Sequence, residues 1–261
     1  MADEPIRFND GAGYEQMMGV WSRLAGEVFL DWISPPRRRD WVDVGCGNGA
    51  FTELVAARCA PTSIEGIDPS PEQIDYARKR HTAGIARFQQ GDAMALPYAG
   101  ASFDVGAMAL VIFFVPEPAV GLAEMVRVVR PGGIIAAYAW DILGGGFPLE
   151  PAYAALREMQ LPANLAPRAD IARLERLQAL WEAGGLSDVH TREIVVQRPF
   201  ADFEAFWSTV LVGPGRGAIA AMTDTQRSEF KARTLQNVVT DAVGRQVYTG
   251  RAVAVKGIRP H

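Results

Sequence analysis

The feature that most constrains the fold is a regular alternation of β-rich and helix-forming segments across residues 41–140. Residues 41–44 are short and β-rich, the glycine-containing turn 45–49 follows, and residues 50–58 have the pattern of a helix. The same strand-to-helix unit then repeats along the chain. Because parallel strands need a crossover connection, usually a helix, this alternation predicts an α/β fold with a doubly wound, mostly parallel sheet.

The complete pattern predicts a seven-stranded Rossmann-like sheet with an N-terminal helical lid. Helical insertions are expected after the fifth strand and between the sixth and seventh. The expected strands are residues 41–44, 63–68, 86–90, 103–114, 134–140, 189–196 and 252–258. The expected helices are residues 14–33, 50–58, 71–80, 118–129, 171–183, 202–211 and 225–242.

The length of 261 residues suits a single domain that contains a helical insertion. We expect residues 1–261 to form one domain in four parts. These are the lid helix at 1–35, a cofactor-binding core at 36–141, a late strand with helical cap elements at 142–250, and the last strand and tail at 251–261.

The charge balance argues against a general nucleic-acid binder. Lys and Arg total 26 against 30 Asp and Glu, which gives a formal net charge of -4. The one basic run, residues 37–39, follows two prolines and is interpreted as a solvated loop. We therefore expect a small-molecule substrate and no nucleic-acid partner. The oligomeric state cannot be read from the sequence.

Apolar runs and cysteines indicate a cytoplasmic location. The longest uncharged apolar run, residues 105–115, is too short to span a bilayer, and the charged N-terminus does not resemble a secretory signal. Cys46 and Cys59 are the two cysteines, so no disulfide framework is expected. No zinc-type Cys/His spacing is present either, so no metal site is expected.

The turn at residues 45–49 is a candidate ligand site. Its glycines partly fit the dinucleotide pattern, with Ala50 where the third glycine would fall. Asp68 closes the next strand, where a carboxylate can accept hydrogen bonds from both ribose hydroxyls. This spacing suits an adenosine cofactor or NAD, and a tight strand-to-helix turn without a ligand is a third interpretation.

Four segments in order carry a resemblance to a known family. Residues 41–49 resemble the first motif of class I S-adenosylmethionine methyltransferases, and residues 127–133 resemble their turn into the fifth strand. Residues 90–98 with 102–105 are similar to the family's third-strand and fourth-strand region. Residues 14–23 resemble the lead helix of the type 11 group, which includes quinone-biosynthesis and many small-molecule methyltransferases.

The resemblance implies that S-adenosylmethionine is the cofactor and S-adenosylhomocysteine the product. By the same resemblance, the glycines let the backbone approach the methionine moiety, Asp43 lies near its ammonium group, Asp68 holds the ribose, and Asp92 with Ala93 meets the adenine. The implied cofactor-binding residues are Tyr14, Met18, Ser22, Asp43, Gly45, Gly47, Asn48, Asp68, Pro69, Asp92, Ala93 and Ala109.

No catalytic base is named from the sequence. Many relatives place a histidine or another polar group in the stretch 110–114, which here is apolar throughout. His81, His190 and His261 lie far from it in the predicted topology. The substrate candidates are aromatic residues at the end of the fifth strand and in the later helical regions, where an aromatic is more often cap core: Trp140, Phe147, Tyr153, Phe203 and Trp207.

Three functions stay open at this point. The leading one is methyl transfer to a small-molecule acceptor by in-line displacement, with the acceptor atom O, N or C undecided. A nicotinamide-dependent oxidoreductase shares the sheet and the ribose carboxylate, but it needs a turn that faces a pyrophosphate. The absence of an assigned base prompts the third, a non-catalytic S-adenosylmethionine-binding protein.

Overall fold

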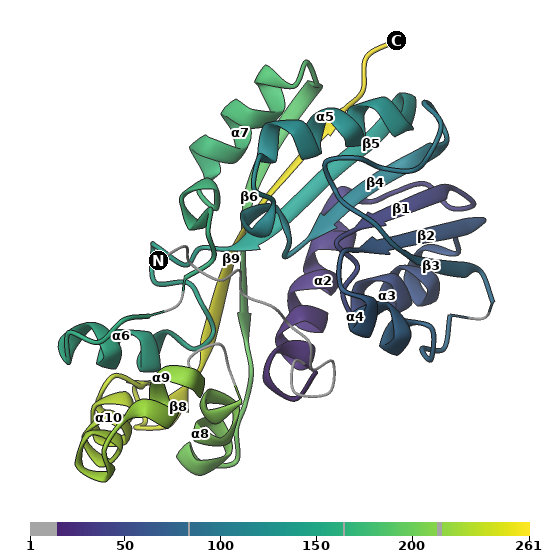
Figure 1. Ribbon diagram of the computed structural model, residues 1–261. Coiled ribbons are helices and arrows are strands. Elements are labelled where there is room, and N and C mark those ends of the chain that lie inside the picture. Colours follow the sequence, from purple (N-terminus) through teal and green to yellow (C-terminus); the bar gives the residue numbers. More distant parts are fainter. Residues whose placement is uncertain (1–14, 83, 164, 213–215) are drawn as a thin grey trace.

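A seven-stranded sheet forms the centre of the molecule (Figure 1). The computed structural model describes residues 15–82, 84–163, 165–212 and 216–261. The sheet order is β3-β2-β1-β4-β5-β9-β6, and β9 runs antiparallel to both β5 and β6, while the other six strands run in one direction. The strands are β1 (Asp40–Val44), β2 (Ser63–Asp68), β3 (Ala86–Gln90), β4 (Phe103–Ala109), β5 (Val129–Trp140), β6 (Ser187–Gln197) and β9 (Thr249–Ile258). The predicted fold class is confirmed.

Helices cover both faces of this sheet. Figure 1 shows α2, α3 and α4 on one face and α5 and α7 on the other. A short π-helix, η1, leads directly into α2. The bounds are η1 (Glu15–Gly19), α2 (Val20–Ile33), α3 (Ala50–Cys59), α4 (Pro71–Ala77), α5 (Pro118–Val128) and α7 (Leu174–Ala183). The switch of faces between α4 and α5 accompanies the reversal of strand order at β1 and β4, which opens a crevice at the carboxyl ends of the strands.

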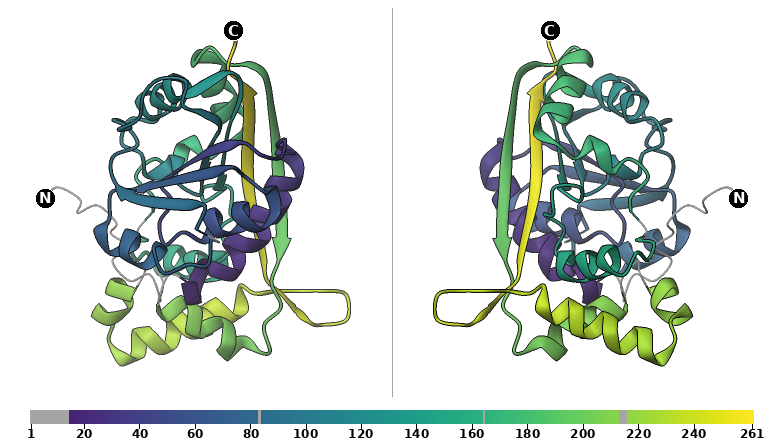
Figure 2. Two further views of the ribbon diagram at one scale, coloured as in Figure 1. Left: turned by 90° about the vertical axis from the view of Figure 1, so that its right-hand side faces the viewer. Right: turned by 90° about the vertical axis from the view of Figure 1, so that its left-hand side faces the viewer.

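The remaining helices gather at one end of the sheet (Figures 1 and 2). They come from the two predicted insertions, and α10 packs against α6. This cap contains α6 (Glu150–Glu158), α8 (Phe203–Leu211), α9 (Arg216–Ala221) and α10 (Asp224–Gln236). The sequence pattern missed α6, α9, the 3-10 turn η3 (Ala169–Ile171) and the hairpin of β7 (Val239–Thr240) with β8 (Gln246–Val247).

The fourth strand ends earlier than predicted. Its expected range, 103–114, was wrong beyond Ala109, because Leu110 adopts a left-handed conformation with φ 62°. The 3-10 helix η2 (Ile112–Phe114) follows at once. The uninterrupted apolar pattern hid this break, since a buried strand and a buried turn can have the same composition. The break turns the chain across the mouth of the crevice.

Other boundaries also differ from the predicted ones, among them the end of α4 at Ala77 instead of residue 80 and the start of α7 at Leu174 instead of residue 171. The last long helix, expected to reach residue 242, ends at Gln236 because the chain enters β7 three residues later. The fifth strand begins at Val129 instead of residue 134, and its irregular start contains Gly132 at φ 78°. In the part of the chain that the structure describes, no helix is long and apolar enough to cross a membrane.

Candidate functional site

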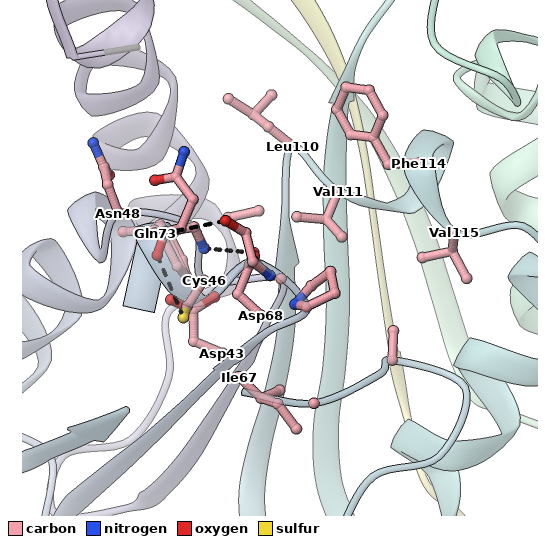
Figure 3. A pocket seen from close by; sticks show the side chains of 18 of the residues that line it. Asp43, Cys46, Asn48, Ile67, Asp68, Gln73, Leu110, Val111, Phe114 and Val115 are labelled. Atoms are coloured by element: carbon pink, nitrogen blue, oxygen red, sulfur yellow. Dashed lines mark hydrogen bonds between the residues drawn. The ribbon is translucent and has the colours of Figure 1, made fainter. Parts of the chain in front are cut away.

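A cavity of about 690 Å³ lies at the carboxyl ends of β1, β2 and β4. Figure 3 shows its two sides: Asp43, Asp68, Asn48 and Gln73 gather on one, and apolar side chains from the turn after β4 face them. This is the edge where the reversal of strand order opens the sheet. The cavity therefore lies where the sequence predicted a ligand.

The glycine turn is shaped to keep side chains out of this cavity. Gly45 has φ 74°, and a Cβ on it would lie 2.4 Å from Cγ1 of Val111, so no side chain fits there. Its amide donates to the carbonyl of Ile67 at 2.7 Å, which ties the turn to β2. Gly47 has φ 51° with no chain atom within 4 Å of a Cβ position, so its backbone faces open space.

Asp68 is fixed at the end of β2 by two backbone donors. Its Oδ2 accepts from the amide of Gly47 at 2.9 Å, and its Oδ1 accepts from the amide of Ser70 at 2.9 Å. Burial raises the pKa of Asp68, and the two hydrogen bonds oppose that shift. A carboxylate oxygen can accept more than one hydrogen bond, so both oxygens retain capacity toward the cavity.

Asp43 is the most deeply buried carboxyl group in the lining. It is 1% exposed, and its Oδ2 accepts from the hydroxyl of Thr52 at 2.6 Å. Its Oδ1 is buried without a hydrogen-bond partner. Burial raises the pKa of Asp43 to about 7, with repulsion from Asp68 adding to the shift and the Thr52 bond opposing it. A buried carboxyl group in this state favours a cationic ligand that supplies the missing donor.

The loop after β3 forms the third polar part of the lining. Asp92 accepts from the amide of Met94 at 2.8 Å, and Ala93 lines the cavity beside it. Arg127 on α5 holds the far end of the loop, because its guanidinium donates to the carbonyls of Leu96 and Tyr98. The loop is therefore anchored from the opposite face of the sheet.

Asn48 lines the cavity, but its amide group also makes contacts within the chain. Its Nδ2 donates to Oε2 of Glu15 at 3.0 Å, and its Oδ1 accepts from the amide of Ala50 at 3.2 Å. Both contacts hold the start of α3 and the N-terminal π-helix against the glycine turn. Asn48 was predicted to bind the cofactor, and these contacts indicate that its side chain also holds the glycine turn in place.

The opposite wall is apolar. Leu110 and Val111 come from the break after β4, and Phe114 follows on η2 (Figure 3). Phe51 and Tyr138 also line the cavity, with ring centroids 6.1 Å apart. A wall of this kind excludes water and strengthens the electrostatic contacts made on the carboxylate side.

Most predicted cofactor residues that the structure describes meet at this cavity, and Met18 does not. Met18 is buried in the hydrophobic core and is absent from the lining, while Tyr14 lies outside the described residues. The predicted residues in the lining are Ser22, Asp43, Gly45, Gly47, Asn48, Asp68, Pro69, Asp92, Ala93 and Ala109.

The five substrate candidates do not line this cavity. Trp140 is buried at the end of β5, and its ring packs against Gly250 on β9, where a Cβ would lie 3.0 Å from Cζ3 of the ring. Phe147 and Tyr153 pack edge to face with centroids 5.1 Å apart, and Phe203 stacks on Trp207 at 6.1 Å. These contacts are those of core aromatics, and a role in acceptor binding stays a prediction.

Several lining residues were missed by sequence reasoning. Glu72 and Gln73 belong to the first turn of α4, and Phe51 to the first turn of α3. The available signal was the capping serine, Ser70, whose Oγ accepts from the amide of Gln73 and fixes the start of α4 beside Asp68. The sequence could therefore have predicted that the first turns of α3 and α4, which follow the first two strands, lie beside the ligand.

The ionisable lining groups are carboxylates, one thiol and one phenol. The carboxyl groups are those of Asp43, Asp68, Glu72 and Asp92, and the described lining contains no Lys, Arg or His. Cys46 is 5% exposed, and burial raises the pKa of its thiol well above the usual value. It is therefore a neutral packing group in the turn. The described lining offers no histidine to act as a general base.

Comparisons with known proteins agree with this architecture. Residues 42–137 match the family model described as "Methyltransferase domain". Over 115 residues the chain is 38% identical to demethylmenaquinone methyltransferase of Deinococcus radiodurans, which covers 43% of this chain and 46% of that protein. Over 150 residues it is 39% identical to an O-methyltransferase of Pyrenophora dematioidea, covering 55% of each. The matches thus span about half the length of these curated relatives.

A solved structure extends the likeness to nearly the whole chain. Phosphoethanolamine N-methyltransferase 2 of Haemonchus contortus, in complex with S-adenosyl-L-methionine, superposes with a TM-score of 0.58 at 15% identity. The match covers 96% of this chain and 57% of that one. At this identity the likeness concerns the fold alone.

Proposed function

Since residues 42–137 form a class I S-adenosylmethionine-dependent methyltransferase domain of the type 11 group, we propose that the whole chain transfers a methyl group to a small-molecule acceptor. In this proposal residues 1–261 act as one domain. The cavity at the glycine turn holds the cofactor, and the cap contributes to the acceptor side. A cytoplasmic location and the absence of a nucleic-acid partner belong to the same proposal.

The charge of the cavity is the observation that carries the proposal. Four carboxyl groups and no Lys or Arg belong to its described lining. S-adenosylmethionine has a sulfonium and an ammonium group, whereas NAD presents a pyrophosphate with two negative charges. Since like charges repel in a partly buried site, the lining favours the cationic cofactor and disfavours the dinucleotide. This argues against the oxidoreductase alternative.

In this proposal each lining residue contacts a different part of the cofactor. Asp43 would meet the ammonium group, because it has a buried carboxylate oxygen without a partner. Asp68 would accept from the ribose hydroxyls, and Asp92 with the amide of Ala93 would meet the adenine. Gly47 leaves space for close backbone approach, and Ala109, Pro69 and Ser22 would complete the contact surface.

When bound, S-adenosylmethionine supplies a methyl group on a positively charged sulfur. The chain's contribution to an in-line displacement is to hold the acceptor atom on the line of attack and to exclude water. Leu110, Val111 and Phe114 provide a dry wall at the break after β4. The transition state disperses charge, so an apolar wall does not oppose it.

The identity of the acceptor is a narrower question. The apolar wall and the lack of a lining histidine favour an acceptor that ionises or reacts without a strong protein base. The curated relatives are named for a quinone precursor and for O-methylation. We propose a small apolar-bodied acceptor, with an oxygen, nitrogen or carbon atom as the nucleophile.

A methyl-transfer assay tests the proposal. The full chain is incubated with methyl-labelled S-adenosylmethionine and panels of phenols, quinols, amines and carboxylic acids, and S-adenosylhomocysteine release is measured. Turnover with at least one class is expected. Tight cofactor binding without turnover across a broad panel would favour the non-catalytic alternative.

A further inference from the structure

The side chain of Arg80 contacts three parts of the chain: the glycine turn, α3 and η1. It follows α4 in the chain, and its side chain is 11% exposed. Nε donates to the carbonyl oxygen of Asn48 at 2.8 Å, and one terminal nitrogen donates to Oε2 of Glu53 on α3 at 2.8 Å. The other terminal nitrogen forms an ion pair with Glu15 on η1. One planar guanidinium therefore joins the turn, the following helix and the N-terminal π-helix.

Glu15 is held from the cavity side as well. Its Oε2 accepts from Nδ2 of Asn48 at 3.0 Å in addition to its pair with Arg80. The element that carries it, η1, packs against α2 and against the cap helix α8. Glu15 thus fixes the junction between the glycine turn and the segment that leads toward the cap.

Arginine suits this position better than lysine. A guanidinium donates in several fixed directions at once, whereas an ammonium on a flexible stem cannot reach three partners in one plane. Two carboxylates next to one cation are held together only while the cation is present. The pKa of Arg80 is raised by these partners against the effect of burial, so its charge is retained.

We propose that Arg80 is a positioning residue that couples the docking of η1 to the shape of the glycine turn. The proposal rests on the cofactor-binding function proposed above. Release of η1 removes Glu15 from Nδ2 of Asn48 and from the guanidinium of Arg80. The side chain of Asn48 and the guanidinium that holds its carbonyl then lose a shared anchor, and the glycine turn that lines the cavity is held less firmly. Asn48 acts within this coupling, as the residue whose carbonyl and amide are both engaged.

The test measures how fast the cofactor leaves. Wild type, Glu15→Gln, Arg80→Lys and Arg80→Gln are loaded with tritiated S-adenosylmethionine, and its loss is followed after an unlabelled chase. We expect dissociation to be about tenfold faster in Glu15→Gln and Arg80→Gln, the range for loss of a charged hydrogen bond, with Arg80→Lys in between. The double variant Glu15→Gln/Arg80→Gln should be no faster than about twice the Arg80→Gln variant, because both changes break the same contact.

Arg130 provides the matched control. It also joins carboxylates from two elements, Asp40 at 3.2 Å and Asp104 at 3.0 Å, but at the amino ends of β1 and β4, away from the cavity. Arg130→Gln should lower the melting temperature and leave cofactor dissociation within about twofold of wild type.

The outcomes separate the two proposals. If wild type retains the labelled cofactor and the Glu15 and Arg80 variants lose it at the wild-type rate, the coupling is wrong and the cofactor site stands. Equal acceleration in Arg130→Gln also contradicts the coupling, because general loosening then explains the effect. If wild type does not bind the cofactor, the proposed function fails and this inference fails with it. Should Arg80→Gln not fold, Glu15→Gln and Arg80→Lys decide the question.

Discussion

Asp43 and Asp68 lie at the ends of neighbouring strands, but their surroundings differ. Asp68 receives two backbone donors, while Asp43 has one hydroxyl donor and one oxygen without a partner. Both carboxyl groups are buried enough to have raised pKa values, and the shift is large for Asp43. The pKa of a buried carboxyl group that lacks a hydrogen-bond donor falls most strongly when a cationic ligand binds beside it. The two positions therefore allow separate tests.

Cofactor affinity should depend on pH through Asp43. In the cofactor-free protein its pKa is about 7, so the group is mostly protonated at pH 6 and mostly ionised at pH 8. Binding of an ammonium group favours the carboxylate and releases a proton, so affinity rises with pH. We expect about tenfold weaker binding of S-adenosylhomocysteine at pH 6 than at pH 8, measured by calorimetry in buffers of different ionisation enthalpy.

The variant Asp43→Asn is the control for this dependence. It keeps the shape of the side chain but removes its titration, so affinity should be low and nearly constant between pH 6 and pH 8. A variant that keeps the wild-type pH dependence would assign the titration to another group, such as Asp68.

The raised pKa of Asp43 also has a consequence for folding stability. The contribution of Asp43 to the free energy of unfolding should fall as pH rises from about 4 to about 7, because the folded state retains a proton that the unfolded state releases.

Replacement of Asp68 tests the ribose contact. Asp68→Ala should weaken cofactor binding by about 1–3 kcal/mol, because ribose hydroxyls and the amide of Gly47 would then lack an acceptor in a partly buried site. Asp75→Ala on the exposed side of α4, where Asp75 pairs with Arg78, should leave binding unchanged. Unchanged affinity in Asp68→Ala would remove this residue from the site.

At the residue scale, sequence reasoning located the cavity lining but not how each side chain is used. The three aspartates at strand ends were predictable because parallel strands end at one edge of the sheet. The contacts of Asn48 with Glu15 and Ala50 depend on how η1 packs, which no local pattern encodes. The aromatic candidates were chosen by composition, and their burial against one another came from the cap's tertiary packing.

The glycine turn joins β1 to α3, and its glycines have distinct requirements. Gly45 is restricted by its conformation and by Val111, which stands directly over it. Gly47 shares the left-handed conformation but has no chain atom near a Cβ position. One glycine therefore protects the packing of the turn, and the other leaves space in the cavity.

Alanine at each position should separate stability from binding. Gly45→Ala should lower the free energy of unfolding by about 2–4 kcal/mol, because it adds a clash to an unfavourable φ. Gly47→Ala should lower it by only about 1 kcal/mol while reducing cofactor affinity at least about tenfold. Denaturant unfolding and calorimetry measure the two effects, and the reverse order of stabilities would contradict this description of the turn.

At the scale of elements, the alternation of strands and helices was predictable and the breaks were not. Strands β2 and β3 have the predicted bounds, because turn residues flank both. The end of β4 was hidden by continuous apolar residues, and its left-handed Leu110 became visible only in the fold. Short elements such as α9 and β7 carry too few residues for a periodic signal.

The whole molecule combines a sheet that holds the cavity with a helical cap at the end of the sheet. Within the cap, Trp207 stacks on Phe203, and its ring centroid is 5.4 Å from that of Phe230 on α10. Trp207 is 6% exposed and does not line the cavity. The cap therefore has a core of its own, apart from the cofactor contacts.

Truncation of Trp207 should affect the cap and not the cofactor site. Trp207→Ala should lower the free energy of unfolding by about 3 kcal/mol, because it leaves a cavity between α8 and α10. Affinity for S-adenosylhomocysteine should stay within about twofold of wild type. Chemical denaturation and calorimetry test both statements, and a large loss of cofactor affinity with unchanged stability would place Trp207 in the site instead.

The central claim is that the carboxylate-lined cavity holds a cationic adenosine cofactor. Calorimetric titration of the full chain at pH 8 with S-adenosylhomocysteine and, separately, with NAD tests it most directly. We predict saturable one-to-one binding of S-adenosylhomocysteine that Asp68→Ala weakens, and no heat of binding with NAD. Tight binding of NAD with no response to S-adenosylhomocysteine would contradict it.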